Sequence, residues 1–264
     1  MGGLARLLGR VRIRRKRGRG HIHSPDACYP EKRAEAQARV ELARAPGPSR
    51  IVTCYLDEVT YERQPSLASA YEAVGRDPHT GHTHQPLARL SPRGQTLTRA
   101  VGALDVSSGQ VVWRQDWKVG IKELVAFYEQ LRAAYPDAER LYVIQDNWPV
   151  HFHPDVLVAL EPQTTPWPPK RPPSWSDDPS PAAVRRWGRL HLPIQLVFLP
   201  TYASWLNPIE KLWRWLRQDV LHLHRLADDL VTLREAVATF LDRFAQPGDL
   251  TAALLRYVGL HLPD

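Results

Sequence analysis

Three acidic residues carry the chemistry that this sequence suggests. Asp57 comes directly after an apolar run at 51–56, and Asp146 lies just beyond a second run at 141–144. Glu210 stands near the start of a segment with helical periodicity. Ligands of open α/β sheets bind at the carboxyl ends of the strands. If the two strands are neighbours, we therefore expect the three carboxylates to meet at one edge of a sheet.

Clustered carboxylates repel one another unless divalent cations bridge them, and hard oxygen donors suit Mg²⁺ or Mn²⁺. Two ions roughly 4 Å apart can activate a water or a 3′-hydroxyl and stabilise the leaving oxygen of a phosphodiester. The alternative is that Asp57 and Asp146 are turn formers, and that Glu210 completes a capping box with Asn207. Glu58 competes with Asp57 for the first position, but strand alternation sends only one of the two towards the site.

The elements that must position these acids are those of a mixed sheet. Strand-like runs lie at 51–56, 97–104, 111–117, 141–144 and 194–199. A Ser-Ser-Gly turn joins the second and third runs, which we expect to be antiparallel. Apolar residues between Ile121 and Leu131 follow a helical period, so the chain forms a βαβ unit before the fourth run. The sequence predicts an α/β fold with helices flanking the sheet.

Two further helices follow the last predicted strand. Asn207 suits the N-cap and Pro208 the first helical position. The expected buried stripe of this helix is Ile209, Leu212, Trp213, Leu216, Val220 and Leu223. A final helix is predicted over 230–244.

Positive charge is concentrated at the N-terminus. Residues 1–50 hold 13 Lys or Arg against four acids, within a chain of net charge +7. This density predicts multivalent contacts with DNA phosphates. The expected DNA-binding residues of this arm are Arg12, Arg14, Arg15, Lys16, Arg17 and Arg19. An organelle-targeting presequence has a similar composition, but the charged helix at 25–45 and the Pro-Gly-Pro linker that follow argue against it.

Other features bound the class of protein. The two cysteines, Cys28 and Cys54, support neither a disulfide framework nor a zinc site, and no apolar run is long enough to span a membrane. We therefore expect a cytoplasmic protein without a membrane partner. Four His-x-His pairs lack the further ligands that a transition-metal site needs. The stretch 161–192 is rich in Pro and Trp, which predicts an irregular insertion.

Three segments together resemble a known family. They are YLDE (55–58), VIQDNWPVH (143–151) and LPTYASWLNPIEKLWRWLR (199–217). In this order they resemble the catalytic domain of DDE transposases of bacterial insertion sequences related to mariner elements, over about residues 50–245. The resemblance implies a ribonuclease-H-like fold with Asp57, Asp146 and Glu210 as the metal-binding triad. It also implies cleavage at transposon ends and strand transfer into target DNA, carried out by a homo-oligomer assembled on the DNA and, in a bacterial cell, in association with the nucleoid.

The resemblance also sets expected domain boundaries. Residues 1–48 would be a basic arm, a short helix and a linker, left from an N-terminal DNA-binding domain. Residues 49–250 would be the DDE domain with its insertion at 161–192, followed by a C-terminal tail at 251–264. The 63 residues between Asp146 and Glu210 are about twice the family's usual spacing, and the insertion accounts for the excess.

Several neighbours of the triad are candidates for supporting roles, and some of them have a structural alternative. Asn147 is placed to hydrogen-bond an adjacent carboxylate. His151 either orients a water or phosphate, or bonds to backbone at a helix start. Arg214 and Arg217 either grip DNA phosphate or form salt bridges on the helix.

The tryptophans at 148, 205, 213 and 215 are candidates for base stacking, although Trp213 fits the core better. The preferred interpretation of the whole chain is a metal-dependent transposase. A nuclease or resolvase without joining activity, and an inactive DNA-binding remnant, are the alternatives.

Overall fold

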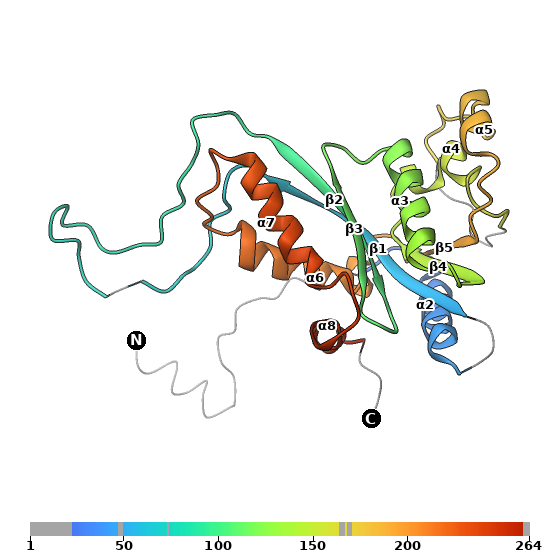
Figure 1. Cartoon of the computed structure of the whole chain (residues 1–264), viewed down its shortest axis with the longest axis horizontal. Coiled ribbons are helices and arrows are strands. Elements are labelled where there is room, and N and C mark those ends of the chain that lie inside the picture. The colour runs from blue at the N-terminus through green and yellow to red at the C-terminus, as the bar shows by residue number, and fades with distance from the viewer. Residues whose placement is uncertain (1–22, 47–49, 73, 164–166, 168–170, 261–264) are drawn as a thin grey trace, which may run out of the picture.

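The computed structural model describes residues 23–46, 50–72, 74–163, 167 and 171–260 (Figure 1). The basic residues predicted to bind DNA in the N-terminal arm, Arg12, Arg14, Arg15, Lys16, Arg17 and Arg19, lie outside these residues. Within the described part, no helix has both the length and the apolar character needed to cross a bilayer.

A five-stranded mixed sheet organises the chain, in the order β3-β2-β1-β4-β5. Its strands are β1 (Ile51–Glu62), β2 (Leu97–Asp105), β3 (Val111–Asp116), β4 (Arg140–Gln145) and β5 (Ile194–Phe198). The first three are antiparallel neighbours, whereas β1, β4 and β5 are parallel. The predicted mixed sheet is confirmed.

Successive residues of β1 point to opposite faces of the sheet, so both faces carry apolar side chains. Helices cover each face and close an apolar core on it. Cys54 and Leu56 face a core closed by α3 (Ile121–Ala134), α4 (Pro154–Leu157) and α5 (Pro181–Trp187). Val59 and Tyr61 face a core closed by α6 (Ile209–Leu216), α7 (Leu230–Asp242) and α8 (Asp249–Val258). Figure 1 shows α3 and the α6–α7 pair on opposite sides of the strands.

The N-terminal helix α2 (Tyr29–Arg44) belongs to the folded body. Its Ala36 and Val40 are buried against Tyr55 and Tyr142 of the central strands. The helix was expected to belong with the arm and the linker, outside the catalytic domain, but it packs on the sheet. At the other end, the structure has α8 where a tail was expected, and Leu254 and Val258 of that helix are buried.

Two elements differ in length from their predicted form. β1 continues to Glu62 because it pairs with β2 along its whole second half. The helix after Glu210 is regular only to Leu216, and a π-helical turn, Arg217–Leu221, follows. Val220 is consequently half-buried, and Leu223 adopts a φ of 50° outside any helix.

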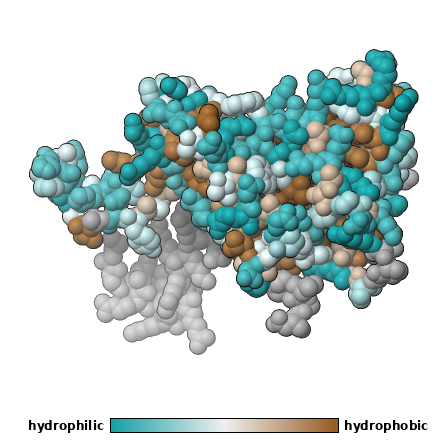
Figure 2. Space-filling view, viewed as in Figure 1, coloured by the Kyte–Doolittle hydropathy of each residue, from teal (hydrophilic) through white to brown (hydrophobic). Residues whose placement is uncertain are grey.

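The connection from β1 to β2 projects away from the body (Figure 1). Figure 2 shows mainly hydrophilic residues on this projection. Apolar side chains that it carries, such as Leu67 and Tyr71, are exposed. This segment therefore adds little to either core.

Candidate active site

Strand register brings Asp57 and Asp146 to the same level of the sheet. The last pair between the parallel strands β1 and β4 joins Tyr55 to Ile144. Two residues further along each strand stand Asp57 and Asp146. β4 ends at Gln145, so Asp146 is exposed at its carboxyl end, while Asp57 remains within β1. Asp146 thus follows its strand as predicted, whereas Asp57 lies at the predicted level but within a strand that continues past it.

Glu210 reaches the same place through the loop between β5 and α6. Asn207 of this loop is buried, and its Nδ2 donates to the carbonyl oxygen of Leu56 at 3.0 Å. The prediction that Asn207 caps the helix is wrong, since α6 begins after Pro208 without a side-chain cap. Glu210 therefore does not form a capping box with Asn207, which was the alternative to a functional role for this residue.

The three carboxylates line one cavity of about 530 Å³. Its wall includes Asn147 and Trp148 beside Asp146, and most of the β5–α6 loop from Leu199 to Asn207. Tyr202 and Trp205 of this loop are largely exposed, at 77% and 48%. The cavity is open enough for these aromatic rings to contact a large ligand.

Trp213 holds Asp57 from the α6 side of the sheet. The indole is buried, and its Nε1 donates to Asp57 Oδ2 at 3.1 Å. Gly102 pairs with Asp57 across β1 and β2. A Cβ on Gly102 would lie 2.7 Å from the indole ring, so only glycine leaves room for it. Trp213 is in the core as predicted, but its contact with the carboxylate was not predicted.

Asp57 is in an environment that resists ionisation. Burial, as the largest cause, and the negative charges of Glu210, Glu58 and Asp146, in that order, together raise its pKa from 3.8 to about 8. Such a shift is typical of carboxylates crowded in a poorly solvated site.

Burial also raises the pKa of Glu210, although Arg217 and Arg214 oppose this shift through their positive charge. Both arginines are exposed, and neither forms an ion pair among the residues that the structure describes. The salt bridges considered for them on α6 are therefore not seen in that part of the chain. Their contact with DNA phosphate stays a prediction.

His151 connects two acids behind the cavity. Its side chain is completely buried, with Nε2 3.1 Å from Glu58 Oε1 and Nδ1 3.4 Å from Asp146 Oδ1. Burial alone would lower the pKa of His151, but the charge and hydrogen bond of Glu58, together with Asp146, raise it above its ordinary value. Glu58 thus lies on the opposite face from Asp57, as alternation requires. His151 Nδ1 also lies 3.5 Å from the backbone carbonyl of Asp146, the kind of backbone contact that its alternative role predicted, so Glu58 helps to position Asp146 through the histidine.

Asn147 makes a different bond from the predicted one. Its Nδ2 donates to the Leu199 carbonyl at 2.6 Å, so it holds the β5–α6 loop and not a carboxylate.

The other tryptophans predicted as candidates for base stacking lie in two different places. Trp148 and Trp205 line the cavity, whereas Trp215 packs on Phe240 and Phe244.

The donor set suits a divalent cation. Carboxylate oxygens are the ligands that Mg²⁺ and Mn²⁺ prefer. Burial and then neighbouring negative charges raise the pKa of Asp57, and a cation would offset both by favouring the charged form. Within the described ranges, no three His, Cys, Asp or Glu side chains already converge on one point. The carboxylates therefore share a cavity but must adjust to chelate one ion. The same result gives no support to a His-x-His metal site.

Comparison with known proteins agrees with this arrangement. The model of a family described as DDE superfamily endonuclease matches residues 52–234. No curated protein matches the sequence significantly.

Solved structures with the same fold include the Mos1 mariner paired end complex with Mn, at 18% identity and a TM-score of 0.55. The Mos1 strand transfer complex and the paired end complex with Mg match at the same 18% identity, with TM-scores of 0.52 and 0.53. Each match covers 97% of this chain and 65–66% of the other. The chain thus spans about two thirds of the length of these proteins. At this identity the likeness shows the fold, which is the predicted ribonuclease-H-like arrangement.

Proposed function

Because this chain belongs to the DDE superfamily endonucleases, we propose that it is the catalytic part of a DNA transposase, with Asp57, Asp146 and Glu210 as its metal ligands. One observation carries the proposal. Acids from the middle of β1, the end of β4 and the start of α6 line a single cavity, and two of them have raised pKa values. A structural role for all three acids would not explain this crowding.

The similar structures support the metal and the substrate. They are described as Mos1 complexes with Mn and with Mg, as a paired end complex and as a strand transfer complex. For this chain we infer the same chemistry: cleavage of transposon-end DNA, strand transfer into target DNA, and assembly of more than one copy on the DNA. In a bacterial cell this work would take place in the cytoplasm, at the nucleoid.

When bound, one or two divalent ions would supply an activated water or 3′-hydroxyl and stabilise the leaving oxygen. The residues of this chain have separate tasks. Trp213 fixes Asp57 by its indole hydrogen bond, and His151 fixes Asp146 while Glu58 accepts from its other nitrogen. Asn147 holds the loop that leads to Glu210. Arg214 and Arg217, exposed beyond Glu210, would contact DNA phosphates.

Nicking of supercoiled plasmid in Mn²⁺ at low salt tests this proposal. The full chain is compared with Asp146→Asn and Glu210→Gln, and Asp77→Asn serves as a remote control because Asp77 lies in the β1–β2 connection. We expect the wild type and the control to nick and the two site variants to lose at least about 100-fold in rate.

Strand transfer is measured separately, with a duplex that carries a free transposon-end 3′-hydroxyl. Joined products support the transposase, whereas nicking without joining favours the nuclease or resolvase. Absence of nicking by the wild type, together with DNA binding that is unaffected by Mn²⁺ and by Asp146→Asn, would favour an inactive DNA-binding protein and refute the enzyme.

A further inference from the structure

The β5–α6 loop, residues 199–208, is the connection on which the position of Glu210 depends. Two of its anchors come from the sheet edge that carries the other acids. Asn147, next to Asp146, binds the carbonyl of Leu199, and Asn207 binds the carbonyl of Leu56, next to Asp57. The middle of the loop is held by a third anchor from a distant part of the chain.

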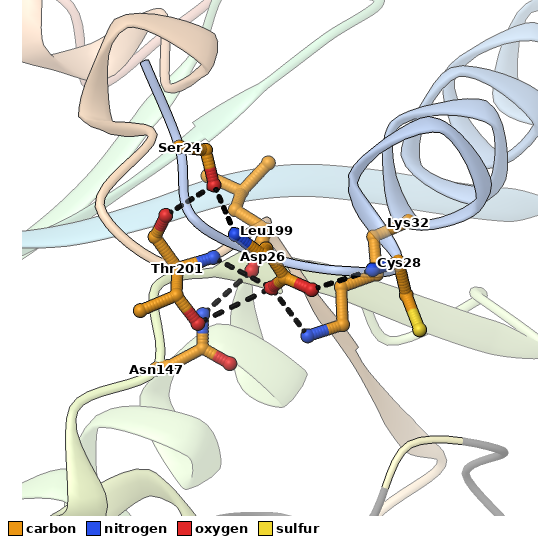
Figure 3. Close-up of polar contacts among 7 residues, drawn as sticks. All are labelled: Ser24, Asp26, Cys28, Lys32, Asn147, Leu199 and Thr201. Carbon is orange, nitrogen blue, oxygen red and sulfur yellow. Dashed lines mark hydrogen bonds and ion pairs between the residues drawn. The ribbon is translucent and has the colours of Figure 1, made fainter. Parts of the chain in front are cut away.

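That third anchor is residues 24–28, which we call the anchor segment (Figure 3). The backbone N–H of Thr201 donates to Asp26 Oδ2 at 2.8 Å, and the Thr201 hydroxyl donates to the same oxygen at 3.2 Å. In return, Ser24 Oγ donates to the Thr201 carbonyl at 2.5 Å. Both backbone polar groups of Thr201 are therefore satisfied by residues 175 and 177 positions away.

The anchor segment is itself rigidly built. Asp26 Oδ1 accepts from the backbone N–H of Cys28, while Lys32 Nζ lies 2.8 Å from Oδ2. The side chains of Asp26 and Lys32 are only 8% and 10% exposed. These bonds hold the pKa of Asp26 well below its usual range, although burial opposes this. A buried, charge-paired carboxylate with four donors is costly to disturb.

A cap for α2 would explain only part of this geometry. The Cys28 contact serves the start of that helix, but Oδ2 is directed to the loop. The held residue, Thr201, also stands beside Tyr202, whose φ of 55° is a strained conformation for a tyrosine. The anchor thus lies next to the strained residue of the loop. At this residue the backbone turns the side chain of Tyr202 out along the cavity.

We propose that Asp26 is a positioning residue for the carboxylate site: it acts through Thr201 to hold the β5–α6 loop, and with it Glu210, in the geometry that the reaction needs. This inference rests on the proposed function. It extends the working unit beyond residues 52–234, the part that the family model matches.

Three variants of the full chain test the role of Asp26. Asp26→Asn removes the charge that pairs with Lys32, and its single acceptor oxygen cannot serve both Thr201 and Cys28, so the anchor is weakened in either amide orientation. Ser24→Ala removes the bond to the Thr201 carbonyl, together with the bond that Ser24 Oγ accepts from the Asp26 N–H, and leaves the buried ion pair intact. Asp229→Asn is the matched control, because Asp229 also accepts from both the N–H and the hydroxyl of one threonine, Thr232, far from the cavity.

Plasmid nicking in Mn²⁺ gives the first readout. We expect Asp26→Asn to lower the maximal rate by ten-fold or more, on the order of the cost of misplacing a reacting group, with an unchanged half-saturating DNA concentration. Ser24→Ala should show a smaller loss of the same kind. Asp229→Asn should nick at the wild-type rate after correction for any change in Tm.

Brief digestion with chymotrypsin gives a readout that does not depend on activity. Cleavage after Tyr202 should become several-fold faster in Asp26→Asn and Ser24→Ala, while cleavage after Tyr71, exposed in the β1–β2 connection, stays constant as an internal reference. If the wild type fails to nick, the proposed function fails, and this digestion still decides whether the anchor holds the loop. Wild-type nicking and unchanged Tyr202 cleavage in both variants would overturn the inference. A rate loss shared equally by Asp229→Asn would overturn it too.

Discussion

The apo protein should lose stability as pH rises, because of Asp57. An acid whose pKa is higher in the folded state binds its proton more tightly there. Its contribution is fully present below the unfolded pKa of 3.8 and is lost as pH rises through the folded value of about 8. At about 1.4 kcal/mol per pKa unit, these two values predict a fall of about 3 kcal/mol in the free energy of unfolding between about pH 5.5 and 8.5.

Asp57→Asn should remove this part of the slope. The variant keeps an oxygen that can accept from Trp213 Nε1 but cannot ionise. Urea unfolding of wild type and variant, in EDTA and at matched ionic strength, measures the difference at each pH. His151 has a raised pKa and contributes a slope of the same sign, so only the difference between the two proteins reports on Asp57. Equal slopes in both proteins would refute the crowded, protonated carboxylate inferred here.

Three further predictions concern neighbouring residues. Asp146→Asn should leave the apo protein at least as stable as wild type but abolish its Mn²⁺-induced rise in Tm; an equal Mn²⁺ shift in both would contradict a shared site. Gly102→Ala should cost about 1–3 kcal/mol and slow nicking, since the new Cβ would displace Trp213; unchanged unfolding and nicking would show that the indole has room. Asn207→Ala should cost about 1–3 kcal/mol in urea unfolding, because the buried Leu56 carbonyl loses its donor, whereas Asn147→Ala, at a half-buried position, should cost less.

Local patterns were sufficient to predict the sheet and two of the acids. Continuous apolar runs mark strands buried on both faces, and the residue after such a run falls at the strand's carboxyl end. This reasoning places Asp146 correctly. It places Asp57 at the right level but ends β1 too early, since nothing in the run at 51–56 reveals that β2 supports the strand up to Glu62.

Hydrogen bonds between residues far apart in the sequence explain why the contacts of the β5–α6 loop were not predicted. Asn-Pro-x-Glu is a good helix-start pattern, but the side chain of Asn207 is directed to the Leu56 carbonyl, just beyond the last β1–β4 pair. The contact of Asp26 with Thr201 spans 175 residues and leaves no trace in either segment alone. Helix α8, by contrast, has a readable signal: Leu254, Leu255 and Val258 share one face, and Gly259 ends the helix with a φ of 85°.

The long spacing between Asp146 and Glu210 does not disturb the site, because the segment at 161–192, predicted to be an insertion, leaves and re-enters the fold at one point. A bridge joins Leu160 to Leu192, and two backbone hydrogen bonds, from Glu161 to Leu192 and from Leu192 to Ala159, close it. β5 starts two residues later and pairs with β4 up to Phe198. The segment is not irregular throughout, contrary to the prediction, because it includes α5, whose Ala183 and Trp187 are buried in the core. Its closed ends leave unchanged the register that sets Asp146 beside the loop to Glu210.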